Sequence, residues 1–192
     1  MDDRGDILRR LESTDRKSGP APYESARTGT VEELTDLFIN NLAKGGGVGE
    51  FVRIKDLDSK LETMAKDFDK VLNLSDRTGI HSCGIDSNHL AQVDRIDLLI
   101  INGRMGVAGN GAVWITGDQL VERRFPFIAI QVVVILPKNK LLYDLTQAYQ
   151  RIQLEQDGFG IWIAGPSKTA DIEQSLVIGA QGARRHTVLI TD

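Results

Sequence analysis

The stretch that decides the fold is Phe159-Gly-Ile-Trp-Ile-Ala164, which runs directly into Gly165-Pro-Ser-Lys-Thr-Ala-Asp-Ile-Glu173. The first six residues carry no charge and no polar alternation, which is typical of a strand buried on both faces. Apolar residues then recur every fourth position from Ile172 to Ala180, and this spacing predicts a helix over about residues 168–181. A buried strand that leads into an amphipathic helix indicates an α/β protein.

The turn between this strand and this helix is a candidate ligand site. A helix that begins just after a strand directs free backbone N–H groups and a partial positive charge into the crevice, where they favour a carboxylate, phosphate or carbonyl oxygen. Ser167 or Thr169 can cap the helix, and a cap with a tight turn explains the same residues without a ligand. The residues expected to bind a ligand here are Gly165, Pro166, Ser167, Lys168, Thr169, Asp171 and Glu173.

Strands and helices are expected to alternate along the rest of the chain. Thr30-Val-Glu-Glu33 is a capping-box pattern, and the helix that it opens is expected to stop at Gly45-Gly-Gly47. Further helices are expected at about residues 57–69 and 141–155. The expected strands are residues 50–54, 70–74, 97–101, 112–115, 127–136, 159–164 and 187–190. Joined by right-handed crossovers, these elements predict an α/β fold with a largely parallel sheet flanked by helices.

A second glycine-rich segment is expected to complete the ligand crevice, because ligands in open parallel sheets bind beyond the carboxyl ends of the strands. This segment is Gly106-Val-Ala-Gly-Asn-Gly111, in which Gly106, Asn110 and Gly111 are the expected binding residues. Its glycines permit close backbone approach, and the amide of Asn110 offers one acceptor and two donors.

Composition limits the class of protein. The chain has 192 residues, of which 41% are hydrophobic and 26% charged, and this balance suits a soluble domain with a substantial core. Residues 1–29, rich in charge, Ser, Gly and Pro, are expected to form a flexible arm, and residues 30–192 a single domain.

The formal net charge of −4 argues against nucleic-acid binding as the main function. The longest apolar run, residues 127–136, is about half the length of a membrane-spanning helix. No secretion signal opens the chain, so a cytoplasmic location is expected.

Potential metal ligands and cations occur outside the glycine-rich segments. His81, Cys83, Asp86 and His89 fall within nine residues, but their spacing matches no familiar metal site and a polar loop collects such residues by chance. We therefore expect no metal here, and we expect the lone Cys83 to be inert, since nothing in the sequence places a base beside it. Arg184, Arg185 and His186 precede the last expected strand, and their arginines suit either an anionic ligand or a solvated loop.

The C-terminal stretch from Ile163 to Ile190 resembles the ending of the LUD domain, a family named for lactate utilisation. Members typically finish with Gly-Pro-Ser-Arg-Thr-Ala-Asp-Ile-Glu, then Gly-x-x-Gly and a terminal strand. Here Lys168 stands in place of the arginine, and Gly179 and Gly182 fit the glycine pair. Gly106-Val-Ala-Gly-Asn-Gly-Ala-Val-Trp114 is also similar to the family, so the resemblance covers roughly residues 30–192.

The resemblance implies a fold similar to the NagB/RpiA/CoA-transferase-like group. It also implies a role similar to the small third component of the bacterial system that oxidises L-lactate to pyruvate. The other two components of that system carry iron–sulfur clusters, so such proteins are the expected partners and no cofactor is expected in this chain. A single cysteine agrees with this division, because it cannot hold a cluster alone. The sequence leaves a homo-oligomer open.

One departure from the family pattern concerns Gly109. Related proteins, like class I CoA-transferases, often carry Glu-Asn-Gly in the middle motif, and the glutamate of the transferases forms an acyl-CoA adduct. This chain reads Gly109-Asn110-Gly111, so that covalent chemistry is excluded at this position unless Glu122 or Glu173 substitutes. We therefore expect non-covalent binding of a small carboxylate. The alternatives are a stand-alone isomerase or acyl-transfer enzyme acting on a sugar-phosphate or CoA-linked substrate, and a non-catalytic interaction subunit.

Overall fold

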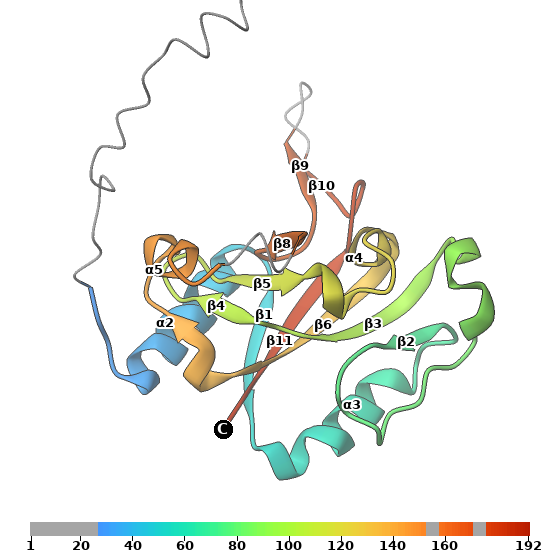
Figure 1. The fold of residues 1–192 in the computed structure, drawn as a ribbon, viewed down its shortest axis with the longest axis horizontal. Coiled ribbons are helices and arrows are strands. Elements are labelled where there is room, and N and C mark those ends of the chain that lie inside the picture. Colours follow the sequence, from blue (N-terminus) through green and yellow to red (C-terminus); the bar gives the residue numbers. More distant parts are fainter. Residues whose placement is uncertain (1–26, 153–157, 171–175) are drawn as a thin grey trace, which may run out of the picture.

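The centre of the protein is a parallel sheet of five strands. The computed structural model describes residues 27–152, 158–170 and 176–192. The sheet has the order β1-β11-β6-β3-β2, and every neighbouring pair in it is parallel (Figure 1). Its strands are β1 (Val48–Val52), β11 (Arg185–Thr191), β6 (Ala129–Pro137), β3 (Ile96–Asn102) and β2 (Val71–Asn73). The expected α/β fold with a largely parallel sheet is therefore confirmed.

The three middle strands, β11, β6 and β3, are buried on both faces. Along β6, Val133 and Ile135 join one hydrophobic cluster while Val132 and Val134 join another, as the two-residue period of a strand requires. The first cluster is covered by α3 (Leu57–Ala65), whose Leu57 and Leu61 are fully buried. The second is covered by α2 (Val31–Lys44) and a smaller sheet. Continuous β-branched runs in these strands follow from this two-sided burial.

The smaller sheet has the order β7-β4-β5-β8 and lies over the second cluster. Its strands are β7 (Leu141–Leu142), β4 (Met105–Val107), β5 (Ala112–Thr116) and β8 (Gly160–Ile163). Residues 160–163 do form a strand, as predicted. The prediction that this strand is buried on both faces is wrong, because it belongs to the smaller sheet. β8 pairs antiparallel with β5. It is half-buried, because Ile161 and Ile163 face the core while Trp162 faces outward.

Two expected helices are corrected. Within residues 168–181, the described parts are the antiparallel strands β9 (Lys168–Ala170) and β10 (Leu176–Ile178), which project from the body in Figure 1. Val177 and Ile178 are β-branched and favour a strand. Apolar residues at every fourth position from Ile172 to Ala180 form too short a pattern to require a helix. Of the helix expected at residues 141–155, the described part up to residue 152 contains α5 (Leu145–Tyr149), and Leu141 and Leu142 pair instead with β4.

The other elements agree with the sequence within a few residues. Thr30 caps α2 in a complete capping box, in which its hydroxyl accepts from Glu33 N and its own N–H donates to Glu33. The expected strand at 127–136 is preceded by a short helix, α4 (Phe125–Ile128), that takes its first two residues. Of the expected N-terminal arm, residues 1–26 lie outside the described part. None of the described helices has the length and apolar character needed to cross a membrane. The remaining elements are the 3₁₀ turns η1 (Ile54–Asp56), η2 (Ser87–Gln92), η3 (Gly117–Gln119) and η4 (Lys138–Lys140).

The turn between β4 and β5 depends on Gly111. This residue has φ +69°, and a Cβ built on it would lie 2.5 Å from the backbone nitrogen of Leu42 in α2. Gly158 has a similar φ of +63° but no atom within 4 Å of its Cβ position, so it makes a matched control.

We expect Gly111→Ala to lower the free energy of unfolding by about 3 kcal/mol, since it combines left-handed strain with a clash against helix backbone. Gly158→Ala should cost only about 1 kcal/mol from strain alone. Urea denaturation of both variants checks this, and equal losses would show that the contact with α2 is unimportant.

Candidate functional site

The segment that follows β8 borders a cavity of about 300 Å³. Gly165, Ser167 and Lys168 line one side of it, as the sequence led us to expect. Pro126 and Phe127 of α4 line another side. The remaining wall is made by Val132, by the end of β8 from Trp162 to Ala164, and by Gln181, Gly182 and Ala183. The cavity is therefore built from three stretches of the chain, which are residues 126–132, 162–168 and 181–183.

Backbone hydrogen bonds hold this segment against the residues that lead into β11. Ser167 N donates to Ala183 O over 2.8 Å, and Gly179 N donates to Ser167 O over 2.9 Å. Arg184 N in turn donates to Ile130 O at the start of β6. The cavity thus lies at the amino ends of β6 and β11. The sequence had predicted a ligand crevice at the carboxyl ends of the parallel strands, and this prediction is wrong for the Lys168 cavity. The reason is that β8 belongs to the smaller sheet, so the chain leaving it meets the parallel sheet from the other end.

Gly165 is fixed by a backbone contact and by a buried histidine. A Cβ on Gly165 would lie 2.5 Å from the carbonyl oxygen of Gly45, so the turn that ends α2 packs directly on it. Its N–H donates to His186 Nδ1 over 3.1 Å. His186 is only 1% exposed, and burial lowers its pKa from 6.5 to about 4. The imidazole is therefore neutral at pH 7, and because Nδ1 accepts, its proton is on Nε2.

Lys168 is the cation of this cavity. It begins β9 and is exposed, and no carboxylate in the described residues pairs with it. Its ammonium lies over the α2 turn, where a Cβ on Gly46 would be 3.3 Å from Lys168 Nζ. Ser167, the residue before it, is half-buried and also lines the cavity. An unpaired ammonium beside a hydroxyl and apolar walls suits a small anion with an apolar part.

The other predicted binding residues do not line this cavity. Asn110 uses its side-chain oxygen to accept from Ala112 N over 3.0 Å, which shapes the β4–β5 turn. Gly106 lies against the side chains of Leu136 and Leu141, and Gly111 lies against α2. Pro166 is buried, and Thr169 continues β9. Asp171 and Glu173 lie outside the described residues.

Gly109 is exposed in the turn between β4 and β5, and its backbone is held by a hydrogen bond to the chain before α5. Gly109 N donates to Tyr143 O over 2.8 Å, and a Cβ on Gly109 would lie 3.0 Å from that same oxygen. Glu122 is not among the residues that border the cavity.

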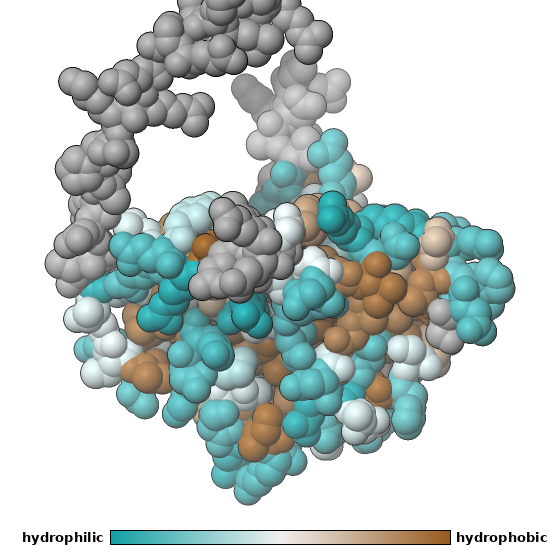
Figure 2. All heavy atoms as spheres, in the orientation of Figure 1, coloured by the Kyte–Doolittle hydropathy of each residue, from teal (hydrophilic) through white to brown (hydrophobic). Residues whose placement is uncertain are grey.

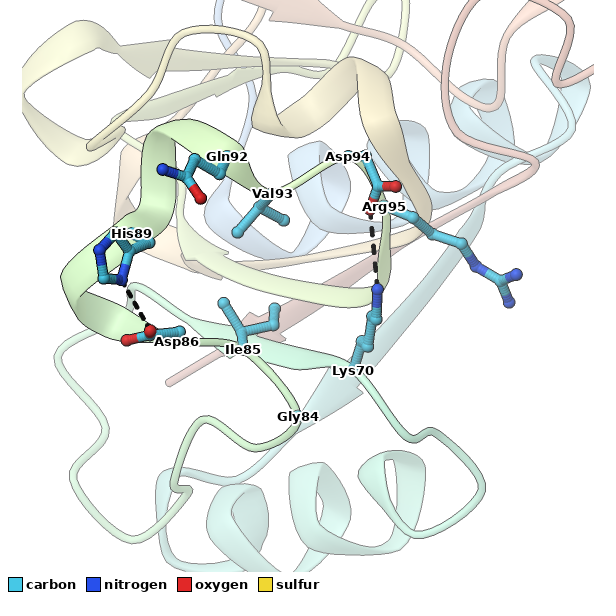
Figure 3. A pocket seen from close by; sticks show the side chains of 9 residues that line it. All are labelled: Lys70, Gly84, Ile85, Asp86, His89, Gln92, Val93, Asp94 and Arg95. Atoms are coloured by element: carbon cyan, nitrogen blue, oxygen red, sulfur yellow. Dashed lines mark hydrogen bonds and ion pairs between the residues drawn. The ribbon is translucent and has the colours of Figure 1, made fainter.

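The loop with His81, Cys83, Asp86 and His89 forms no metal site in the described part of the chain, where no three such side chains converge. Cys83 is exposed and its backbone bridges Val71. A cavity of about 290 Å³ does open beside it, with Lys70 facing Asp94 and His89 facing Asp86 (Figure 3). The hydrogen bond from His89 lowers the pKa of Asp86. Because these charges satisfy one another, this cavity offers little to a charged ligand.

A second cavity of about 450 Å³ adjoins the Lys168 cavity and was not expected from the sequence. Phe127, Gln181 and Gly182 line both. Arg184 and Arg95 line only the second one. The Pro at position 126, near the start of a helix, was the available signal that α4 would turn here and present Phe127.

Comparison with known proteins places this fold in a family. The model of the LUD domain matches residues 23–191. Lactate utilization protein C 1 of Bacillus mycoides (strain KBAB4) is 32% identical over 102 residues, which are 50% of this chain and 44% of that protein. Lactate utilization protein C of Macrococcus caseolyticus (strain JCSC5402) is 28% identical over 112 residues, 55% of this chain and 48% of that protein. The chain thus spans about half the length of the curated relatives it matches.

A solved structure supports the fold alone. The DUF162 family protein of Deinococcus radiodurans superposes with a TM-score of 0.62 and covers 86% of this chain and 100% of its own. The two sequences are 11% identical, so the likeness concerns the backbone and not the ligand.

The low pKa of His186 predicts acid sensitivity. The folded pKa of about 4 lies below the ordinary 6.5, so the unfolded chain takes up the proton first and stability falls as pH drops from about 6.5 toward 4. The loss attributable to this group is roughly 3 kcal/mol at its limit. His186→Gln keeps an acceptor for Gly165 N–H but does not titrate, so we expect its stability to fall less over this range.

Urea denaturation at a series of pH values between 7 and about 4 measures this difference. His81→Gln, at an exposed histidine, is the matched control and should follow the original protein. Parallel curves for all three proteins would contradict the role of His186.

Proposed function

The chain belongs to the LUD-domain family, and from that premise we propose that it binds a small carboxylate of the lactate type for organic-acid utilisation, beside iron–sulfur partner proteins. The observation that carries the proposal is the unpaired ammonium of Lys168 at the edge of a partly apolar cavity. In an acidic protein whose other cavity-lining charges are largely paired, an exposed cation beside a cavity favours an anionic ligand.

The chemistry of the walls suits a short hydroxy or oxo acid. Lys168 supplies the charge for the carboxylate, and the Ser167 hydroxyl can donate to or accept from a ligand oxygen. Phe127, which is 52% exposed, offers an apolar surface to the carbon chain. His186 stays neutral near pH 7, so it holds the backbone of Gly165 without adding charge.

Binding without a covalent intermediate fits the sequence of the turn between β4 and β5. The nucleophilic glutamate of the transferases has no counterpart at Gly109, because glycine carries no carboxylate. Oxidation of a bound hydroxy acid to the oxo acid would release two electrons and two protons, and iron–sulfur clusters in the partner proteins would supply the acceptors for the electrons. The role of this chain is to hold the acid.

The double variant Ser167→Ala with Lys168→Ala is expected to abolish stabilisation by L-lactate. At ~100 times the dissociation constant a ligand raises the free energy of unfolding by about 2.7 kcal/mol, which a thermal-shift assay detects. Both side chains lie at the surface of the cavity, so the double variant should fold normally. Lys66→Ala, at an exposed lysine at the end of α3, should retain the full shift. An undiminished shift in the double variant would reject this site.

Partner binding has a separate test. Co-expression with iron–sulfur subunits of the lactate-oxidation type should give a complex that co-elutes in gel filtration and carries the visible absorbance of the clusters. Free elution of the chain, together with intact lactate binding, would overturn the partner proposal and leave the ligand proposal standing.

A further inference from the structure

The Lys168 cavity and the neighbouring Arg184 cavity adjoin each other, and the pair is called the cleft. Phe127, Gln181 and Gly182 line both of its parts. The smaller part has a volume of about 300 Å³ and the larger about 450 Å³. Lactate or pyruvate would occupy only a fraction of such a space. The size of the cleft therefore favours a longer ligand than the acids considered so far.

The second part of the cleft contains its own unpaired cation. Arg95 in this part is neutralised by Asp97, which it contacts over 2.8 Å, and Asp94 faces Lys70 at 3.7 Å. Arg184 has no such partner among the described residues. The cleft thus presents two free cations, one in each part, while the carboxylate that lines it is already paired.

The fold places these two cations on segments that are bonded to each other. Ser167 N donates to Ala183 O, so Lys168 and Arg184 each follow directly after one member of that pair. The stem of Arg184 lies across Gly179, where a Cβ would overlap Arg184 Cγ. This packing limits the directions in which the guanidinium can extend. The backbone therefore fixes the two points from which the cationic side chains extend.

An apolar surface lies between the two ends. Phe127 is 52% exposed and borders both parts of the cleft. Figure 2 shows brown, apolar atoms gathered around α4 with teal, hydrophilic atoms about them. An exposed aromatic ring between two cations suits the carbon chain of a ligand that is charged at both ends.

We propose that the ligand of this cleft is an extended organic dianion, with one anionic group at Lys168, the other at Arg184, and its carbon chain across Phe127. The first group is a carboxylate and the second is a carboxylate or a phosphate. This inference rests on the proposed function, because it takes the Lys168 end as the carboxylate site and adds a second end.

Isothermal titration calorimetry with ligands matched in length tests the inference. Straight-chain dicarboxylates from malonate to suberate are compared with the monocarboxylate of the same carbon number, and 3-phosphoglycerate is compared with glycerate. We expect one length of dicarboxylate, or the phosphate, to bind about tenfold more tightly than its singly charged counterpart. Whether the dicarboxylate or the phosphoglycerate gains more identifies the second group.

Variants assign the gain to its residue. Arg184→Ala should reduce the dianion to the affinity of the matched monoanion and leave the monoanion unchanged, whereas Lys168→Ala should weaken both. Arg184→Lys should restore part of the gain, and Arg185→Ala, at the neighbouring exposed arginine that does not line the cleft, should have no effect.

The two proposals fail in different ways. Equal affinity for matched dianions and monoanions, or an equal effect of Arg184→Ala on both, would overturn the second end while the carboxylate site at Lys168 remains. No binding of any acid, or binding that Lys168→Ala does not change, would overturn the carboxylate site and the second end together.

Discussion

Burial of β11, β6 and β3 on both faces is the constraint on which the rest of the structure depends. Strands with apolar side chains on either side must be covered twice, and the chain does so with α3 on one face and with α2 and the smaller sheet on the other. The smaller sheet in turn buries only one of its own faces in this way, which leaves Trp162 and Trp114 to pack with α5. The cleft opens where this second layer ends, so its position follows from the demand for coverage.

The predictable part of the fold was the part governed by local chemistry or by continuous burial. The capping box at Thr30 and the β-branched run of β6 are local patterns that each favour one structure, and both formed as expected. The helix prediction for residues 168–181 was wrong because residues four apart lie on one face of a strand as well as on one face of a helix. The four residues of β8 do not show which sheet the strand will join, since that choice depends on its partner β5.

The candidate site was half predictable for the same reason. Gly165, Ser167 and Lys168 stood out because glycine, a hydroxyl and a cation follow an apolar run. Phe127 and Gln181 did not, since no pattern within α4 or within residues 179–183 shows that they will meet. His186 was noticed as part of a basic cluster, yet its role comes from burial, which changes a cation into a neutral acceptor for the Gly165 amide.

The strand between β1 and β6, β11, is also the last strand described in the chain. On the ribosome, β1 and β6 therefore exist for a time with nothing between them, although both carry side chains meant for the core. Parallel strands that are far apart in the sequence pair slowly, and until they pair the edges of β1 and β6 stay exposed. The nascent chain must be kept from aggregating until residues 185–191 emerge, so its yield in the cell should depend on chaperones that shield unfinished sheets.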